Sequence, residues 1–336
     1  MTRRPAVAFA MLSEFVPQLF PPQQLARLRQ CATLLSPRPL TDPLARDEAV
    51  IFRDAELLLT GWGAPVLTRE VLDVAPYLRG VVHCAGTVKG IVTPDLFARG
   101  IAVTSAAGIN AFPVAEYALS AILSAGKRLR EVEGTFRRAR ADWDPAMLPA
   151  DMGNHGRVIG IVGASRVGRR LLGMLRAHDY HVLIYDVFIS ASEAWALGAR
   201  KVELDELCAS ASIVSLHAPA LPSTHHMIDA RRLELMPDGA TLINTARGSL
   251  LDQKALEREL VSGRLRAVLD VTEPQPLPSD SPLYELPNVT LTPHIAGSIG
   301  NELERIGAAA VDEVARYAAG RRFAREIDAH SLSTQA

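Results

Sequence analysis

Short apolar segments alternate with helix-like segments along almost the whole chain, and this rhythm constrains the fold more than any other feature. In the first third, apolar stretches lie at 6–11, 57–60, 81–83 and 102–104, with helical patterns at 22–31 and 68–74. A second series starts at Arg157, with apolar stretches at 158–162, 181–185, 213–216, 241–244, 267–270 and 289–291. This alternation predicts an α/β fold of βαβ units, and six strands in this spacing are typical of a doubly wound parallel sheet.

Length and charge narrow the class of protein further. The 336 residues suffice for two domains, and 36 Lys and Arg against 37 Asp and Glu give a net charge of -1. This balance favours a small-molecule partner over nucleic acid. The three cysteines, Cys31, Cys84 and Cys208, lie too far apart for a disulfide framework or a metal motif, which favours a reducing cytoplasm. The apolar start lacks a cleavage site, and no stretch predicts a membrane span.

The stretch 160–168 ends a predicted strand and opens a predicted helix with the spacing of a dinucleotide-binding turn. Gly163 permits a tight turn, and Gly168 lets the helix pack closely on the strand. Backbone N–H groups at the helix start, near Arg166 and Val167, can then face a pyrophosphate. Ser165 stands where the middle glycine is expected, and its hydroxyl could itself donate to a phosphate.

Asp186 ends the next predicted strand, 23 residues after Gly163. A carboxylate in this position accepts from both ribose hydroxyls of an adenosine and repels a 2′-phosphate, so the sequence favours NAD over NADP. A methyltransferase can also combine a glycine-rich turn with an acidic strand end, and the segments that follow disfavour that alternative.

Polar residues follow three further predicted strands, in the stretches 244–248, 270–276 and 292–297. Ligands of open α/β sheets bind at the carboxyl ends of the strands, so these residues are expected to converge on one edge. Arg247 offers a permanently charged fork for a carboxylate or a carbonyl oxygen. His294 is suited to move a proton near neutral pH.

Together with the stretches 85–90, 108–110, 114–117 and 215–219, these motifs resemble the D-isomer-specific 2-hydroxyacid dehydrogenases over nearly the whole chain. The resemblance implies two Rossmann-like domains with the active site in the cleft between them. The substrate-binding domain comprises residues 1–108 and returns with a C-terminal helix and tail at 300–336. The NAD-binding domain comprises residues 109–299 and is the part through which such proteins form homodimers.

The resemblance also implies roles for individual residues. Arg247 binds and polarises the 2-oxo acid while His294 exchanges the proton as nicotinamide delivers hydride. The residues expected to bind substrate are Gly86, Thr87, Val88, Lys89 and Asn110. The residues expected to bind the cofactor are Gly163, Ser165, Arg166, Val167, Gly168, Asp186, His217, Ala218, Pro219, Thr245, Ala246, Asp270 and Gly297. Lys89 either meets an acidic or phosphorylated substrate or is simply exposed.

Gln275 departs from the family pattern, which places a Glu beside the catalytic histidine. A carboxylate stabilises an imidazolium, whereas a neutral amide only orients the ring. Glu273, two residues earlier, is an alternative partner. A formate dehydrogenase is a second possible activity, because that branch pairs Gln with His and Asn110 also fits it, although Ala296 stands where those enzymes tend to have Ser. A third alternative is an NAD-sensing corepressor without catalysis.

His225 and His226 form a tempting pair of metal ligands. Adjacent residues seldom point to one ion, and we expect no carboxylate near the pair. We therefore predict a solvated turn and no metal site.

Overall fold

The computed structural model describes residues 3–141, 144 and 148–327, and the last part of the predicted C-terminal tail, from Asp328, lies outside them. The chain forms two compact units, Met1–Asn110 with Ser298–Ala336 (unit 1) and Ala111–Gly297 (unit 2). Unit 1 is thus made of two separate segments. The predicted boundaries lie two residues from these at each crossing. Among the described residues, no helix is both long and apolar enough to cross a bilayer.

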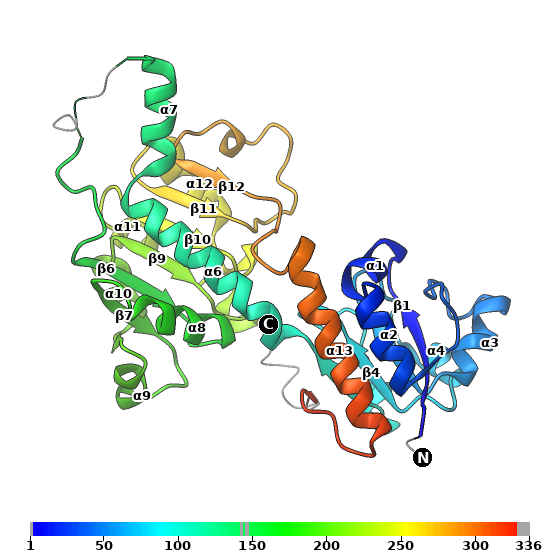
Figure 1. Ribbon diagram of the computed structural model, residues 1–336. Helices are drawn as coiled ribbons and strands as arrows, with labels where there is room; N and C mark the ends of the chain where they lie inside the picture. The colour runs from blue at the N-terminus through cyan, green and yellow to red at the C-terminus, as the bar shows by residue number, and fades with distance from the viewer. Residues whose placement is uncertain (1–2, 142–143, 145–147, 328–336) are drawn as a thin grey trace. The chain divides into compact units, whose positions relative to one another are not determined.

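Unit 1 is built on a five-stranded sheet, ordered β2-β1-β3-β4-β5, in which every pairing is parallel (Figure 1). Its strands are β1 (Ala6–Ala10), β2 (Thr33–Leu34), β3 (Leu57–Thr60), β4 (Gly80–His83) and β5 (Ala102–Ser105). Its α-helices are α1 (Val16–Leu19), α2 (Pro22–Cys31), α3 (Arg46–Asp54), α4 (Arg69–Asp73), α5 (Pro94–Ala98) and α13 (Leu303–Ala318).

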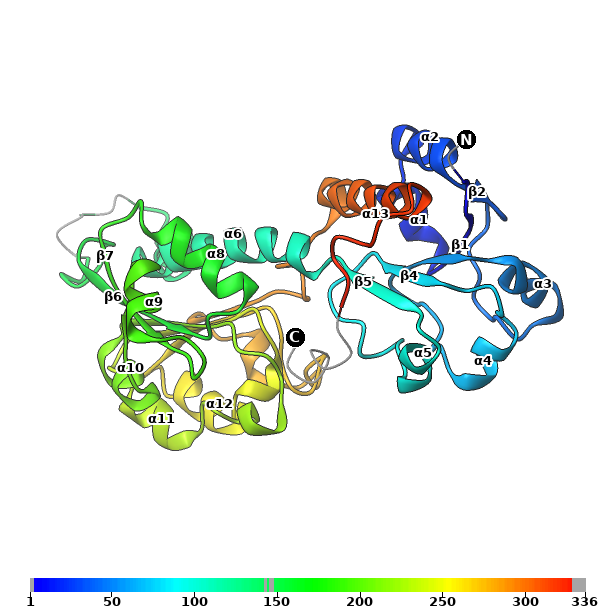
Figure 2. The same cartoon turned by 90° about the horizontal axis from the view of Figure 1, so that it is seen from below.

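Both faces of this sheet are covered, because side chains alternate between the faces along each strand. Val7 and Phe9 pack in the core that includes residues of α1, α2 and α13. Ala8 and Ala10 pack in the opposite core, beneath α3, α4 and α5. Figure 2 shows these two helix layers on either side of the sheet.

Unit 2 contains a seven-stranded sheet, ordered β12-β11-β10-β9-β6-β7-β8, and its pairings are also parallel. The strands are β6 (Arg157–Val162), β7 (Tyr180–Tyr185), β8 (Arg200–Lys201), β9 (Ile213–Leu216), β10 (Thr241–Asn244), β11 (Arg266–Leu269) and β12 (Val289–Leu291). The order reverses between β6 and β9, and such a switch point is where ligands bind in this kind of sheet.

Helices cover both faces of the second sheet as well. One core joins it to α6 (Ala107–Gly126), α8 (Arg166–Leu175) and α9 (Ala191–Ala196). The other joins it to α10 (Leu204–Ser210), α11 (Ala230–Leu235) and α12 (Gln253–Val261) (Figure 2). The doubly wound α/β fold predicted from the sequence is confirmed in both units.

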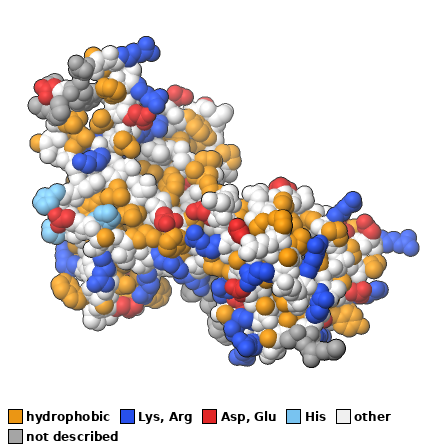
Figure 3. Space-filling view, in the orientation of Figure 1, with side chains coloured by type: hydrophobic (Ala, Val, Ile, Leu, Met, Phe, Trp, Pro, Cys, Tyr) orange, Lys and Arg blue, Asp and Glu red, His pale blue; other side chains and the backbone are white. Residues whose placement is uncertain are grey.

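The main deviations from prediction are short or polar elements. The strands β2 and β8 were not predicted, because two residues are too few to show a period. The helix α3 was not predicted either, although it contains the apolar run 49–52. A further helix not predicted above, α7 (Leu129–Ala139), follows α6 after a break at Arg128, whose φ is +46°. Basic and acidic side chains are interspersed on the face drawn in Figure 3, as expected for a nearly neutral chain.

Candidate active site

The predicted cofactor turn joins β6 to α8 at the switch point of unit 2. Gly163 has a φ of +101°, and a Cβ there would lie 2.8 Å from the backbone nitrogen of Ala218. A Cβ on Gly168 would lie 2.1 Å from the carbonyl oxygen of Gly163. Both positions therefore need glycine, one for the turn and the other for the close approach of helix and strand. The turn lies against the segment 217–219, which the sequence also assigned to the cofactor.

Ser165 has a structural task where the motif usually has glycine. It is the N-cap of α8, and its Oγ accepts a hydrogen bond of 3.3 Å from the backbone N–H of Gly168. Arg166 begins the helix with an exposed side chain, and within the described chain it forms no ion pair. A cation and free N–H groups at a helix start suit an anion such as a pyrophosphate.

Asp186 follows β7, and its carboxylate organises the surrounding turns. One oxygen accepts from the N–H of Ala164 at 2.7 Å, and the other accepts from the N–H groups of Phe188 and Ile189. The side chain is thus fixed beside the cofactor turn, where the sequence placed it.

His217 follows β9 and is buried, with its Nε2 2.9 Å from Oγ of Ser215. Burial lowers the pKa of His217 from its ordinary 6.5 to about 4. The ring is therefore neutral at pH 7 and forms part of the wall beneath Ala218 and Pro219. Direct contact between the His217 side chain and a ligand remains a prediction.

The turn after β10 carries Thr245, Ala246 and Arg247. Oγ1 of Thr245 is buried and has no hydrogen-bond partner among the described residues. Asn244 closes the turn, accepting from the N–H of Ala246 at 3.0 Å and donating to the carbonyl of Arg247 at 2.8 Å.

The Arg247 guanidinium is largely withdrawn from water, and this desolvation lowers its pKa from the ordinary value. It forms no ion pair with any described carboxylate, and its Nη1 donates to the carbonyl of Ala246. Arginine keeps its charge even when desolvated, so Arg247 is a desolvated cation with no described carboxylate beside it.

Asp270 holds the turn that contains His294. The carboxylate is buried and accepts three hydrogen bonds, from Oγ1 of Thr292 (2.6 Å), the N–H of Ile295 (2.8 Å) and the N–H of Ala296 (2.9 Å). The predicted residue Gly297 comes directly after this turn. Because the Asp270 carboxylate already accepts these three hydrogen bonds, its observed role is to hold the turn in place. Its assignment to the cofactor remains a prediction.

The braced turn presents His294 to solvent in a left-handed conformation, with φ of +59°. Nε2 of Gln275 lies 3.1 Å from Nδ1 of His294. The amide, rather than Glu273, is thus the partner of the imidazole. Since an amide can present either its NH₂ or its oxygen, the pair can form with a neutral or a protonated ring.

The predicted substrate loop of unit 1 follows β4. Gly86 is half-buried, Thr87 and Lys89 are exposed, and the Val88 side chain is buried in the core, so that only its backbone can face a ligand. Lys89 forms no ion pair within the described chain. In the same unit, Oδ1 of Asn110 accepts a 2.7 Å hydrogen bond from the N–H of Ser298.

Sequence reasoning missed the residue that holds this loop. His83 is buried at the end of β4, and its Nδ1 lies 3.0 Å from Oγ1 of Thr60 on β3. A second hydrogen bond links His83 to the backbone of Thr87. Burial lowers the pKa of His83 to about 4, so the ring is neutral at pH 7. A lone histidine after an apolar stretch gave no signal of this role.

A second missed group braces the His294 turn from α6. The Tyr117 hydroxyl lies 2.7 Å from Oγ1 of Thr292, which in turn donates to Asp270. Burial raises the pKa of Tyr117 above its usual value. The tyrosine lies in a stretch assigned by resemblance to the crossing between the domains, with no separate role.

One argument from the sequence is corrected by the structure. A carboxylate, that of Glu273, does lie near His225 and His226, and the three ligand atoms are all within 4.8 Å of one another. Two loops that are separate in the sequence meet here, which no local pattern could reveal.

The residues present at the switch point fit a bound dinucleotide. Gly163 leaves the space that a side chain would fill, Arg166 is exposed at the start of α8, and the buried Thr245 hydroxyl has no partner among the described residues. These groups match a ligand with phosphates and with polar groups deep in the site.

Comparison with known proteins agrees with this geometry. A family model described as D-isomer specific 2-hydroxyacid dehydrogenase, NAD binding domain, matches residues 119–296. The chain is 32% identical over 272 residues to glyoxylate reductase of Korarchaeum cryptofilum, covering 80% of this chain and 81% of the relative. It is 30% identical over 270 residues to D-3-phosphoglycerate dehydrogenase of Methanocaldococcus jannaschii, covering 80% and 51%, so it spans about half the length of that relative.

A solved structure resembles the whole chain. D-lactate dehydrogenase from Aquifex aeolicus, complexed with NAD and lactic acid, is 28% identical to it, with a TM-score of 0.73. The similarity covers 96% of this chain and 100% of that one.

Proposed function

Since the chain belongs to the family of D-isomer-specific 2-hydroxyacid dehydrogenases, we propose that it is an NAD-dependent oxidoreductase acting between a small D-2-hydroxy acid and its 2-oxo acid. The observation that carries the proposal is the unpaired, desolvated Arg247 on the same sheet edge as the braced His294. An anionic substrate supplies the partner that Arg247 lacks, and an imidazole is the group that exchanges a proton near neutral pH.

Arg247 binds the substrate and polarises its 2-oxo group. The guanidinium is permanently charged and planar, so it can donate to a carboxylate and to a carbonyl oxygen. Desolvation strengthens these interactions relative to water. Asn244 fixes the backbone of the turn and so limits where the guanidinium can move.

His294 holds the proton that the product hydroxyl needs in the direction of reduction. With its oxygen toward Nδ1, Gln275 accepts from the imidazolium and leaves Nε2–H for the substrate oxygen. Asp270 and Thr292 keep the turn in place while the ring changes its charge.

The residues that would hold NAD are those of the cofactor turn, the α8 N-terminus, Asp186, the segment 217–219 and the turn at Thr245 and Ala246. When bound, NADH supplies the hydride. The carboxylate of Asp186 would accept from ribose hydroxyls and repel a 2′-phosphate, which favours NAD over NADP.

The substrate loop completes the proposal. Backbone N–H groups near Gly86, Thr87 and Val88 bind the substrate carboxylate, with Asn110 in support. Lys89 selects for an additional acidic or phosphoryl group. We also propose that the protein forms a homodimer through unit 2, as the sequence resemblance implies.

A direct test is NADH oxidation with glyoxylate, hydroxypyruvate, pyruvate and bulkier or sugar-derived 2-oxo acids, repeated with NADPH. We expect turnover with at least one substrate and a higher kcat/KM with NADH than with NADPH. Tight NADH binding without turnover of any substrate would instead favour an NAD-sensing protein. A preference for NADPH would overturn the role of Asp186 while leaving the reaction class intact.

The Gln275–His294 pair supports a second candidate, formate oxidation. Formate yields CO₂ and a hydride without releasing a proton to a base, so it needs no carboxylate beside the histidine. NAD reduction with formate, measured beside the 2-oxo acid panel, separates the two activities. Turnover of formate alone would replace the first proposal.

A further inference from the structure

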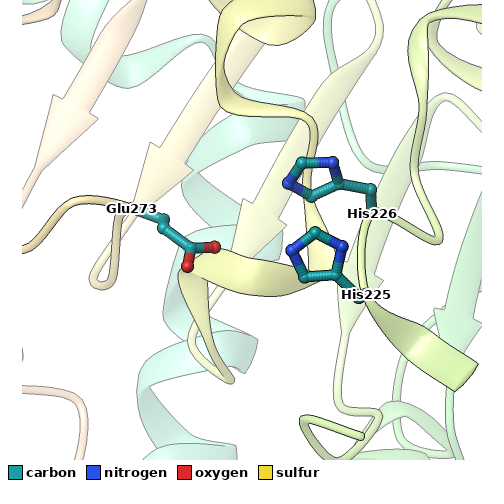
Figure 4. Close-up of side chains that lie close together, drawn as sticks. All are labelled: His225, His226 and Glu273. Carbon is teal, nitrogen blue, oxygen red and sulfur yellow. The ribbon is translucent and has the colours of Figure 1, made fainter. Parts of the chain in front are cut away.

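Two adjacent histidines and a glutamate gather on the surface of unit 2, beside the segment that follows Arg247. Figure 4 shows the His225 and His226 rings stacked together with the Glu273 carboxylate directed toward them. The ring centroids are 3.8 Å apart and the planes are inclined by 22°. All three side chains are exposed, so an ion from solvent can reach them.

The backbone explains why consecutive histidines face the same way. Successive side chains of an extended segment point in opposite directions. His226 has a φ of +50°, in the left-handed region, which turns the chain and brings its ring beside that of His225. The N–H of His226 donates to the carbonyl of Ser249 at 2.8 Å, so this turn is anchored to the segment after Arg247.

The third ligand is held against the same segment. A Cβ on Gly248 would lie 2.2 Å from the carbonyl carbon of Thr272 and 2.6 Å from the backbone nitrogen of Glu273. The turn after β10 and the loop after β11 are therefore in close backbone contact. Ser249 and Gly248 thus fix His226 and Glu273 relative to one another.

None of the three ligand groups is engaged elsewhere in the described chain. Glu273 forms no ion pair there, and the His225 and His226 ring nitrogens accept or donate no hydrogen bond to a described residue. Two imidazole nitrogens and one carboxylate oxygen match a zinc-type donor set with water in the fourth position. Mg²⁺ and Ca²⁺ prefer oxygen ligands throughout.

We propose that His225, His226 and Glu273 form a binding site for a divalent transition metal of the zinc class. The ion would join the segment after β9 to the loop after β11. Gln275, the partner of His294, lies two residues beyond Glu273 on that loop. Metal binding therefore restricts the loop that positions Gln275.

The test uses the full-length chain without an affinity tag, treated with EDTA and dialysed, and titrated with ZnCl₂ by calorimetry at pH 7.5. We expect one zinc ion per chain and no comparable binding of MgCl₂. Glu273→Gln and His226→Ala should each weaken zinc binding about tenfold or more.

His155→Ala is the matched control, since His155 is another exposed histidine beside a carboxylate, with Nδ1 2.5 Å from Oδ2 of Asp179. It should bind zinc like the wild type. Absence of saturable zinc binding, or equal affinity in Glu273→Gln and wild type, would overturn the proposal. So would an equal loss in His155→Ala, which would indicate scattered surface binding.

Thermal unfolding provides a readout that does not depend on catalysis. Zinc at about a hundredfold excess over its Kd should raise the Tm of the wild type by about 5 °C. The Tm of Glu273→Gln should not change, and its metal-free activity should equal that of the wild type. A zinc-induced rise of the same size in Glu273→Gln would contradict the assigned ligand.

Discussion

Both units bury a histidine at the carboxyl end of a strand, yet the two rings are held differently. His83 in unit 1 bonds to Thr60 on the neighbouring strand and to the backbone of Thr87 in the proposed substrate loop. His217 in unit 2 bonds to Ser215, two residues earlier on its own strand. The His83 ring therefore links β3, the end of β4 and the loop at Thr87, whereas, among the described residues, the His217 ring contacts only its own strand through a hydrogen bond.

This difference suggests how work is divided between the units. Unit 2 carries Arg247 and His294, the side chains proposed to act on the substrate. Asn244 holds the turn of Arg247, and Asp270 holds the turn of His294. Unit 1 offers mainly backbone groups, and a buried neutral imidazole sets their position. Variants in unit 2 should therefore alter the chemical step, while variants around His83 should alter substrate binding.

The largest effect is expected for Arg247 and His294 in unit 2. His294→Asn and Arg247→Gln should each lower kcat/KM about 10³-fold, because proton transfer or substrate polarisation is lost. His155→Asn, an exposed histidine of the same unit, serves as the control and should retain wild-type kinetics. The measurement is kcat/KM from steady-state rates with the best substrate of the panel. Near-normal turnover by His294→Asn would refute the proposed role of His294.

Acid should destabilise both units through their buried histidines. The pKa is about 4 for His83 and for His217, below the ordinary 6.5, so the unfolded chain binds protons that the folded chain does not. The free energy of unfolding is therefore at its full value above pH 6.5 and decreases as the pH falls toward 4. Each histidine accounts for a decrease of about 3 kcal/mol.

Hydrogen exchange at pH 7 and pH 5, followed in peptides from β4 and β9, can detect this loss in each unit separately. His83→Asn should reduce the pH dependence in β4 only, and His217→Asn in β9 only. Equal protection at both pH values in the wild type would show that the rings take up protons in the folded state.

Removing the hydroxyl group that bonds to each buried histidine tests whether the two rings have different roles. Thr60→Val and Ser215→Ala each leave a buried ring nitrogen without its partner and should cost about 1–2 kcal/mol of stability. Only Thr60→Val should also raise the KM for substrate, because His83 holds the Thr87 backbone. Urea unfolding and KM measurements test this pair, and a higher substrate KM in Ser215→Ala would contradict the distinction between the rings.

The smallest effect is expected at Gln275. In Gln275→Glu a carboxylate would stabilise the His294 imidazolium and move the pH–rate profile for reduction upward by about one unit. The matched variant Glu273→Gln should leave the metal-free profile unchanged. Identical profiles for Gln275→Glu and the wild type would mean that the amide and the carboxylate are equivalent here.

Much of the architecture was predictable because its signals are local. The ten longer strands are apolar runs at the predicted places, and the glycines of the cofactor turn occupy positions whose backbone geometry demands them. The short edge strands β2 and β8 were missed, since two residues carry no period and form a strand only by pairing with a neighbour.

The candidate site was predictable to the extent that its residues follow strands. Arg247, His294 and Gln275 do so, and the structure brings Gln275 to His294 as the family resemblance implied. The bracing residues Tyr117 and His83 were not found, because their role depends on partners far away in the sequence. Ser165 was recognised as a departure, and only the structure showed that its hydroxyl caps α8.

The sequence by itself determined the fold class, the turn that suits a dinucleotide and the chemical types at the strand ends, because strand alternation and glycine conformation are properties of neighbouring residues. Only the tertiary structure decided which side chains meet across loops. It placed His83 beside Thr60, and Glu273 beside His225 and His226 rather than beside His294. Contacts of this kind depend on how separate strands pack and on where their connecting loops end, which no single stretch of sequence encodes.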